Sequence, residues 1–178
     1  MKKITIKSYN GLYDVTFFDR IDFSGKKSDR RKKLILIDSH VYSLYKNKLK
    51  KLVKKYPTLL INANEKEKTI VGVNKVINFL QTSQATKKTI LIGIGGGIIQ
   101  DITTFASHIF YRGIEWHYYP TTLLSMSDSC IGAKCGINLN KFKNQIGVFH
   151  SPKKVVIFTE FLNTLREKDI LSGYGEIL

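Results

Sequence analysis

Three consecutive glycines, Gly95-Gly96-Gly97, follow the apolar residues 89–94 and precede a helical pattern. Glycines let a backbone approach a phosphate closely, and the amino terminus of a helix offers oriented N–H groups with a partial positive charge. The run fits neither the GxGxxG dinucleotide fingerprint nor a P-loop, because its spacing differs and it lacks the P-loop lysine. We expect it to bind a phosphate, and the alternative is a tight turn without a ligand.

A second polar stretch covers residues 111–147 and mixes cations and amides with glycines. Lysine supplies a point charge, asparagine both donates and accepts hydrogen bonds, and arginine can bind a phosphate through two N–H groups. A solvated basic loop would not explain Gly132, Gly136 and Gly147, nor the apolar residues between the charges. This stretch favours an anionic ligand that carries hydroxyl groups.

Apolar strands and amphipathic helices alternate along the chain and would position these residues. Strands are predicted at residues 34–37, 59–61, 89–94, 116–119 and 155–158, and helices at 41–56, 67–82 and 98–110. This order predicts an α/β fold with a Rossmann-like parallel sheet flanked by helices. An amino-terminal β-hairpin is predicted where residues 4–8 and 13–18 flank Asn10-Gly11. Ligands of such sheets bind outside the carboxyl ends of the strands, where the glycine run falls.

The composition narrows the range of partners. With 178 residues, 43% of them hydrophobic, the chain suits one folded domain, and its formal net charge is +15. That charge suits nucleic acid, anionic lipid or a phosphorylated small molecule, but the basic segment 24–33 has no aromatic residue among its charges. No apolar run reaches the roughly 18 residues of a membrane span, and no signal-peptide core follows the charged start. We expect a cytoplasmic protein without a nucleic-acid or membrane partner, with Cys130 and Cys135 as free thiols.

Several segments of the chain, in order and in spacing, resemble 3-dehydroquinate synthase. They are residues 95–101, 112–113, 120–124, 128–129, 132–134, 136–138, 143–147, 161–165 and 173–177. The resemblance implies an NAD- and metal-dependent lyase of the shikimate pathway of aromatic amino-acid biosynthesis. Such an enzyme converts the phosphorylated sugar acid 3-deoxy-arabino-heptulosonate 7-phosphate to 3-dehydroquinate and eliminates phosphate. It also implies that the full-length form is a homodimer.

The resemblance implies roles for individual residues. Substrate binding and catalysis fall to Lys134, Asn144 and Arg112, and Arg112 would reach a phosphate across a dimer interface. Glu176 would be the first ligand of a Zn²⁺ or Co²⁺ ion. The residues implied to contact NAD are Asp38, Asn64, Glu65, Lys68, Gly95, Gly96, Gly97, Ile98, Ile99, Gln100, Asp101, Thr121, Thr122, Asp128, Lys134, Lys143, Phe161, Leu162, Asn163 and Thr164.

The chain departs from the family pattern in two respects. Gln100 stands where a glycine is usual, and Ala133 replaces the glycine before Lys134, which could shift the substrate to another sugar phosphate. The two histidine metal ligands of the family have no match, since the chain stops two residues after Glu176. We therefore expect the amino-terminal half of the enzyme, with an NAD-binding α/β domain at residues 1–165 and the beginning of a helical metal-binding domain at 166–178.

Other functions stay open at this stage. The chain could belong to another sugar-phosphate cyclase similar to 2-deoxy-scyllo-inosose synthase, although Gly136-Ile137-Asn138 favours the dehydroquinate branch. It could be part of a metal-dependent polyol dehydrogenase, which shares the architecture but releases NADH. A basic module that binds nucleic acid is disfavoured, because glycine, threonine and aspartate cluster at strand ends, where a small-ligand site belongs. The last alternative is an inactive remnant that only folds and dimerises.

Overall fold

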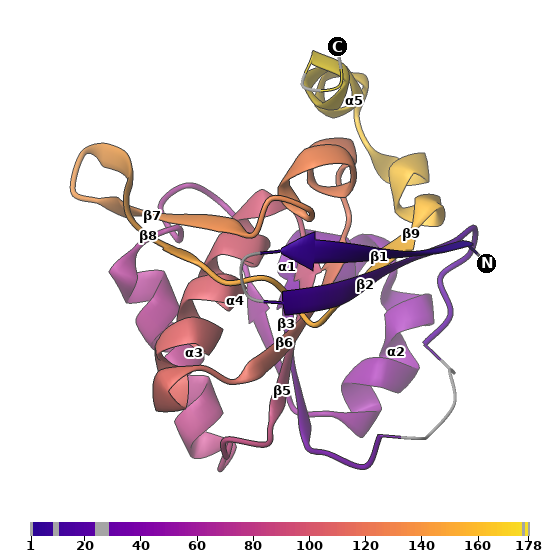
Figure 1. Cartoon of the computed structure of the whole chain (residues 1–178). Helices are drawn as coiled ribbons and strands as arrows, with labels where there is room; N and C mark the ends of the chain where they lie inside the picture. Colours follow the sequence, from indigo (N-terminus) through magenta and orange to yellow (C-terminus); the bar gives the residue numbers. More distant parts are fainter. Residues whose placement is uncertain (1, 9–10, 24–28, 176, 178) are drawn as a thin grey trace.

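The computed structural model describes residues 2–8, 11–23, 29–175 and 177, which form a seven-stranded sheet, flanking helices and a two-stranded sheet (Figure 1). In spatial order, the large sheet contains β1 (Lys2–Ser8), β2 (Gly11–Phe18), β9 (Lys154–Phe158), β6 (Glu115–Pro120), β5 (Ile90–Gly95), β3 (Lys33–Asp38) and β4 (Thr58–Ile61). Every neighbouring pair is parallel except β1 and β2. The predicted parallel sheet and amino-terminal hairpin are confirmed, while the predicted turn residue Asn10 lies outside the described residues.

The central strands are buried on both faces, which explains their unbroken apolar sequences. Residues 34–37 of β3 have no exposed surface, and every residue of β5 is buried. Helices α3 (Ile70–Thr82) and α4 (Gly97–Ile109) cover one face of the sheet, and α2 (Lys46–Lys55) covers the other (Figure 1). Because the strands are parallel, the carboxyl ends of β3, β4, β5, β6 and β9 lie along one edge of the sheet.

The single helix predicted over residues 41–56 is wrong. The structure has two helices, α1 (Ser39–Leu44) and α2, which meet at Tyr45. Tyr45 leaves the helical conformation, with φ −114° and ψ 25°. Its hydroxyl donates to the carbonyl of Glu160 at 2.8 Å, and its ring packs edge-on against Phe161 with 5.0 Å between the ring centroids. These tertiary contacts outweigh the continuous helical pattern.

A β-hairpin that the sequence analysis does not predict occupies the carboxyl-terminal part of the second polar stretch. It consists of β7 (Lys134–Leu139) and β8 (Phe142–Phe149), which pair antiparallel and pack over α4 (Figure 1). Glycines and lysines interrupt the alternation of apolar and polar residues that is typical of a strand, so the pattern does not indicate that Ile137 is fully buried. Asn140 provides the turn, with a left-handed φ of 54°.

Short helical turns connect the remaining elements. They are η1 (Phe110–Arg112) before β6, η2 (Ser125–Ser129) after it, and η3 (Thr159–Thr164) after β9. Helix α5 (Glu167–Gly175) follows η3 near the carboxyl terminus (Figure 1). Over the described ranges, no helix combines the length and the apolar character needed to cross a membrane.

Candidate functional site

Residues that the sequence analysis selects meet at the edge where the parallel strands end. Asp38 is the last residue of β3, Asn64 follows β4, Gly95 ends β5, Thr121 follows β6 and Phe161 follows β9. The five positions come from distant parts of the sequence, and the parallel topology brings them to one side of the molecule. This is the edge at which ligands of open α/β sheets bind.

The glycine turn, residues 95–97, has free space at one of its three positions, at the amino terminus of α4. A Cβ at Gly95 would overlap the side chain of Ile99, and one at Gly96 would lie 3.1 Å from Thr122 Cγ2. At Gly97, in contrast, no described atom lies within 4 Å of the added Cβ. No side chain of the described ranges caps α4, so the N–H groups of its first turn can receive an anion.

Asp101 and Lys68 join the first turn of α4 to the loop that follows β4. Their charged atoms lie 2.6 Å apart, with side chains only 15% and 13% exposed. Asp101 also accepts a hydrogen bond from the N–H of Gly136 in β7, at 3.1 Å. Burial raises the pKa of Asp101, and the hydrogen bond from Lys68 opposes that rise. Two expected NAD contacts therefore contact each other and hold the hairpin against α4.

Asn138 links the hairpin to the same loop. Its side-chain amide donates to Glu65 Oε2 at 2.8 Å, and its side-chain oxygen accepts from the N–H of Asn144 at 3.0 Å. Lys143 lies 4.0 Å from Glu65 and is largely exposed. The structure thus brings Glu65, Asn144 and Lys143 together. Asn138 belongs to a segment that carries the family resemblance, and this membership is the only sequence signal for its role.

Thr121 and Thr122 differ in their surroundings although they are adjacent. Thr122 exchanges hydrogen bonds with Ser125, with 2.9 Å between the two hydroxyl oxygens. Thr121 is 3% exposed, and its hydroxyl finds no partner within the part of the chain that the structure describes. Asp128, in contrast, is exposed on η2. A buried hydroxyl without a partner, on the strand end beside the glycine turn, fits a polar ligand such as a dinucleotide.

Several other expected NAD contacts are buried or hydrogen-bonded within the protein. Ile99 and Phe161 are core residues, and Gln100 is bonded to Ser129. Thr164 donates to the Tyr45 hydroxyl at 3.0 Å, and Asp38 caps α1 by accepting from the N–H of His40. Burial raises the pKa of Asp38. The remaining expected contacts, Ile98, Leu162, Asn163 and Lys134, keep part of their surface exposed.

Arg112 does not lie with the other candidate residues. It belongs to η1, directly before β6, and therefore lies at the opposite edge of the sheet. Tyr111 and Arg112 have left-handed φ angles of 50° and 58°. The ammonium of Lys87 donates to the carbonyls of Tyr111, Arg112 and Gly113 and so holds this turn. Within one chain, the length of the strands therefore separates Arg112 from the glycine turn.

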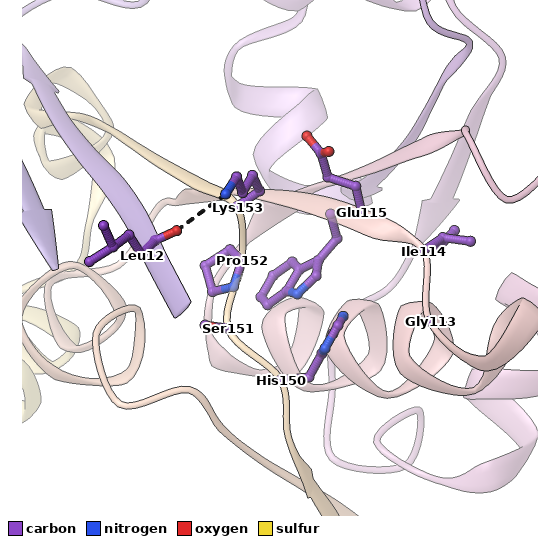
Figure 2. Close-up of a pocket in the computed structure, with 9 residues that line it drawn as sticks. Leu12, Gly113, Ile114, Glu115, His150, Ser151, Pro152 and Lys153 are labelled. Carbon is purple, nitrogen blue, oxygen red and sulfur yellow. Dashed lines mark hydrogen bonds between the residues drawn. The ribbon is translucent and has the colours of Figure 1, made fainter. Parts of the chain in front are cut away.

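A hollow of about 280 Å³ also lies at the edge of Arg112 rather than at the glycine turn (Figure 2). It is lined by Leu12, residues 113–116 and residues 150–153, at the amino ends of β2, β6 and β9. Trp116 Nε1 and His150 Nε2 are buried there, and neither has a hydrogen-bond partner among the described residues. None of the residues expected to bind NAD or substrate lines this hollow.

The described residues do not form a metal site. Glu176 lies outside them, and within them no group of three His, Cys, Asp or Glu side chains could hold a metal ion. Cys130 and Cys135 are buried free thiols in this part of the chain, as predicted. Burial raises the pKa of Cys130 to about 12, so the thiol stays protonated at neutral pH.

Comparison with known sequences relates the chain to one family. Residues 58–172 match the model of a family described as 3-dehydroquinate synthase N-terminal. The chain is 36% identical over 177 residues to a 3-dehydroquinate synthase of Caldanaerobacter subterraneus. This match covers 97% of the chain and 50% of the relative. The chain is 42% identical over 147 residues to one of Pelagibacter ubique, covering 82% and 40%. The chain spans about half the length of the curated relatives it matches, or less.

Solved structures show the same fold. The 2-epi-5-epi-valiolone synthase ValA from Streptomyces hygroscopicus, with NAD⁺ and Zn²⁺ bound, superposes with a TM-score of 0.84 at 31% identity. The match covers 93% of this chain and 48% of ValA. A 2-deoxy-scyllo-inosose synthase complexed with carbaglucose-6-phosphate, NAD⁺ and Co²⁺ gives a TM-score of 0.86 at 22% identity, over 99% of this chain and 50% of that one. The second match concerns the fold alone.

Proposed function

The chain belongs to the 3-dehydroquinate synthase family, and from that premise we propose that it is the NAD-binding half of a sugar-phosphate cyclase. The proposed reaction converts 3-deoxy-arabino-heptulosonate 7-phosphate to 3-dehydroquinate with elimination of phosphate. The observation that carries the proposal is the open amino terminus of α4 at Gly97, with the unpartnered hydroxyl of Thr121 on the neighbouring strand end.

The residues present suit NAD along the whole edge of the sheet. Asp38, Asn64 and Glu65 would receive the adenosine half, and the N–H groups after Gly97 would neutralise the pyrophosphate. The remaining half would extend towards Thr121 and Asp128. When bound, NAD supplies a reversible hydride acceptor for the substrate. The residues of this chain that hold the two ribose groups of NAD would therefore determine where its nicotinamide ring lies.

The hairpin would supply the groups for the phosphorylated substrate. Lys134 and Lys143 are exposed cations, and Asn144 lies next to Lys143 with a left-handed φ of 54°. Cations neutralise a phosphate, and an amide can donate to one oxygen while it accepts from a hydroxyl. Because Asp101 and Asn138 fix the hairpin to α4 and to Glu65, these groups keep a defined distance from the glycine turn.

The second half of such an enzyme would provide the metal site. We propose the boundary at residue 165, so that α5 begins the helical domain and Glu176 contributes one metal ligand. Helix α5 already packs closely, since a Cβ at Gly173 would lie 2.7 Å from Leu123 Cβ. Zn²⁺ or Co²⁺ would polarise a substrate oxygen, but the described residues do not form that site.

The position of Arg112 supports a homodimer in the proposed enzyme. An arginine at the edge opposite the glycine turn is placed to serve an anion on another molecule rather than one at this chain's own glycine turn. A cytoplasmic location and the absence of a nucleic-acid partner stay predictions from the sequence. A polyol dehydrogenase is less favoured, because the likeness to glycerol dehydrogenase from Schizosaccharomyces pombe, with a TM-score of 0.66 at 20% identity, concerns the fold alone.

Two measurements test the proposed function. Calorimetric titration of the 178-residue chain with NAD⁺ should give saturable binding that competes with ADP. Phosphate release from 3-deoxy-arabino-heptulosonate 7-phosphate, with NAD⁺ and Zn²⁺, should appear when the chain is supplemented with the carboxyl-terminal half of a relative. Steady NADH accumulation with a polyol would instead indicate a dehydrogenase. A chain that binds neither NAD⁺ nor ADP would contradict the proposal.

A further inference from the structure

Gln100 makes a two-point contact with a single residue. It is 4% exposed, in the first turn of α4. Its side-chain nitrogen donates to the carbonyl of Ser129 at 2.6 Å, and its side-chain oxygen accepts from the Ser129 hydroxyl at 2.7 Å. Each end of the carboxamide thus has a partner on Ser129. Two bonds between the same residues fix their relative orientation as well as their distance.

Ser129 is the last residue of η2, which has π-helical geometry. Such turns are rare, are mostly single turns, and are frequent at functional sites. The beginning of η2 is fixed by Thr122, which exchanges hydrogen bonds with Ser125. Its end is fixed by Gln100. Asp128 lies between these two fixed points and is exposed.

We propose that Gln100 is a positioning residue that holds η2 against the first turn of α4, so that Asp128 and Thr121 keep their places beside the glycine turn. This inference rests on the proposed function and deepens it. In the sheet order β6-β5-β3-β4, η2 follows β6, whereas Asp38 ends β3 and Asn64 follows β4, both beyond β5. Gln100 therefore supports the part of NAD beyond the pyrophosphate and not the adenosine half.

The test compares two nucleotides on the same variant. In Gln100→Leu, both hydrogen bonds are lost while the side-chain volume stays nearly constant. We expect NAD⁺ to bind about tenfold more weakly, because two hydrogen bonds of ordinary strength contribute a free energy of this order. The affinity for ADP, which lacks the nicotinamide half, should change by less than about twofold on the same reasoning. Ser129→Ala removes one of the two bonds and should give an intermediate effect. A merely structural role would weaken both nucleotides equally.

Ser107→Ala is the matched control. Ser107 is fully buried in the same helix and donates to the carbonyl of Thr104 at 2.9 Å, and within the described ranges no hydrogen bond joins its side chain to η2. Its removal should leave the ratio of NAD⁺ to ADP affinity unchanged. Equal losses for both nucleotides in Gln100→Leu would overturn the proposal.

Amide hydrogen exchange without nucleotide separates this inference from the proposed function. Residues 122–130 should exchange faster in Gln100→Leu than in the wild type or in Ser107→Ala. Unchanged exchange would overturn the positioning role even if NAD⁺ binds. If the wild-type chain binds neither nucleotide, the proposed function fails, and faster exchange would then support only the fixation of η2.

Discussion

The carboxylate of Asp101 lies 2.6 Å from the ammonium of Lys68, and its second oxygen accepts from the N–H of Gly136. One side chain thereby joins α4, the loop after β4 and the β7–β8 hairpin. These three segments carry most of the residues proposed to bind NAD and substrate. The ion pair therefore stabilises the structure of the candidate site in addition to supplying two residues that are proposed to contact the ligand.

Breaking this pair should cost more stability than breaking an exposed one. Lys68→Met leaves the Asp101 carboxylate without its main partner, and we expect the free energy of unfolding to fall by about 3 kcal/mol. The control is Lys3→Met, which breaks an exposed pair with Asp14 and should cost under about 1 kcal/mol. Urea unfolding followed by circular dichroism measures both. Equal losses would contradict the structural role.

Gly97 and Gly95 should respond differently to alanine. Gly97→Ala adds a Cβ in open space at a helical position, so stability should be unchanged or slightly higher, while NAD⁺ affinity should fall about tenfold. Gly95→Ala forces an overlap with Ile99 and should lower stability by roughly 1–3 kcal/mol. Thermal unfolding and calorimetry distinguish the two effects. Gly175→Ala, also in open space, should alter neither property appreciably. Unchanged NAD⁺ binding in Gly97→Ala would count against the glycine turn as the pyrophosphate site.

Stability should fall in acid partly because of Glu115. The hydrogen bonds from His117 and Arg31 lower the pKa of Glu115 from 4.5 to about 2. A carboxylate with a lower pKa in the folded state stabilises the fold above its unfolded pKa and loses this contribution as the pH falls. The free energy of unfolding should therefore decrease between pH 5 and pH 2, and less steeply in Glu115→Gln. Asp19→Asn, which removes an exposed carboxylate, should follow the wild-type profile.

Lys87 should stabilise the left-handed turn that presents Arg112. Loss of its hydrogen bonds to three carbonyls in Lys87→Met should cost about 1–2 kcal/mol and speed amide exchange at residues 110–114. Lys88→Met provides a neighbouring exposed lysine as the control. If the two variants exchange at the same rate over this turn, the proposed support by Lys87 is wrong.

The sequence predicts the parts of the fold in which local pattern and burial agree. The apolar runs at residues 34–37 and 89–94 are buried strands, and the glycine run lies between a strand and a helix, as expected. Contacts between distant residues decide the rest. Tyr45 interrupts a helical pattern because Glu160 and Phe161 attract its hydroxyl and ring.

The candidate site is predictable only in part for the same reason. The glycine turn follows from strand, glycines and helix, but the contact of Gln100 with Ser129 joins residues 29 positions apart. The hairpin is equally hidden, because the burial of Ile137 depends on α4 beneath it. The residue types around Arg112 and the resemblance both predict a phosphate contact, and only the topology reveals that it lies at the opposite edge.

The pairing of β2 with β9 has a consequence for the order of folding. Val15 is in register with Val155, so the second strand of the chain depends on one of its last. During synthesis this hairpin emerges before its neighbour in the sheet, β9, which is made about 140 residues later. An isolated two-stranded hairpin is at best marginally stable in water. The hairpin therefore gains its neighbour in the sheet late, and closing this long loop is expected to be a slow step in folding.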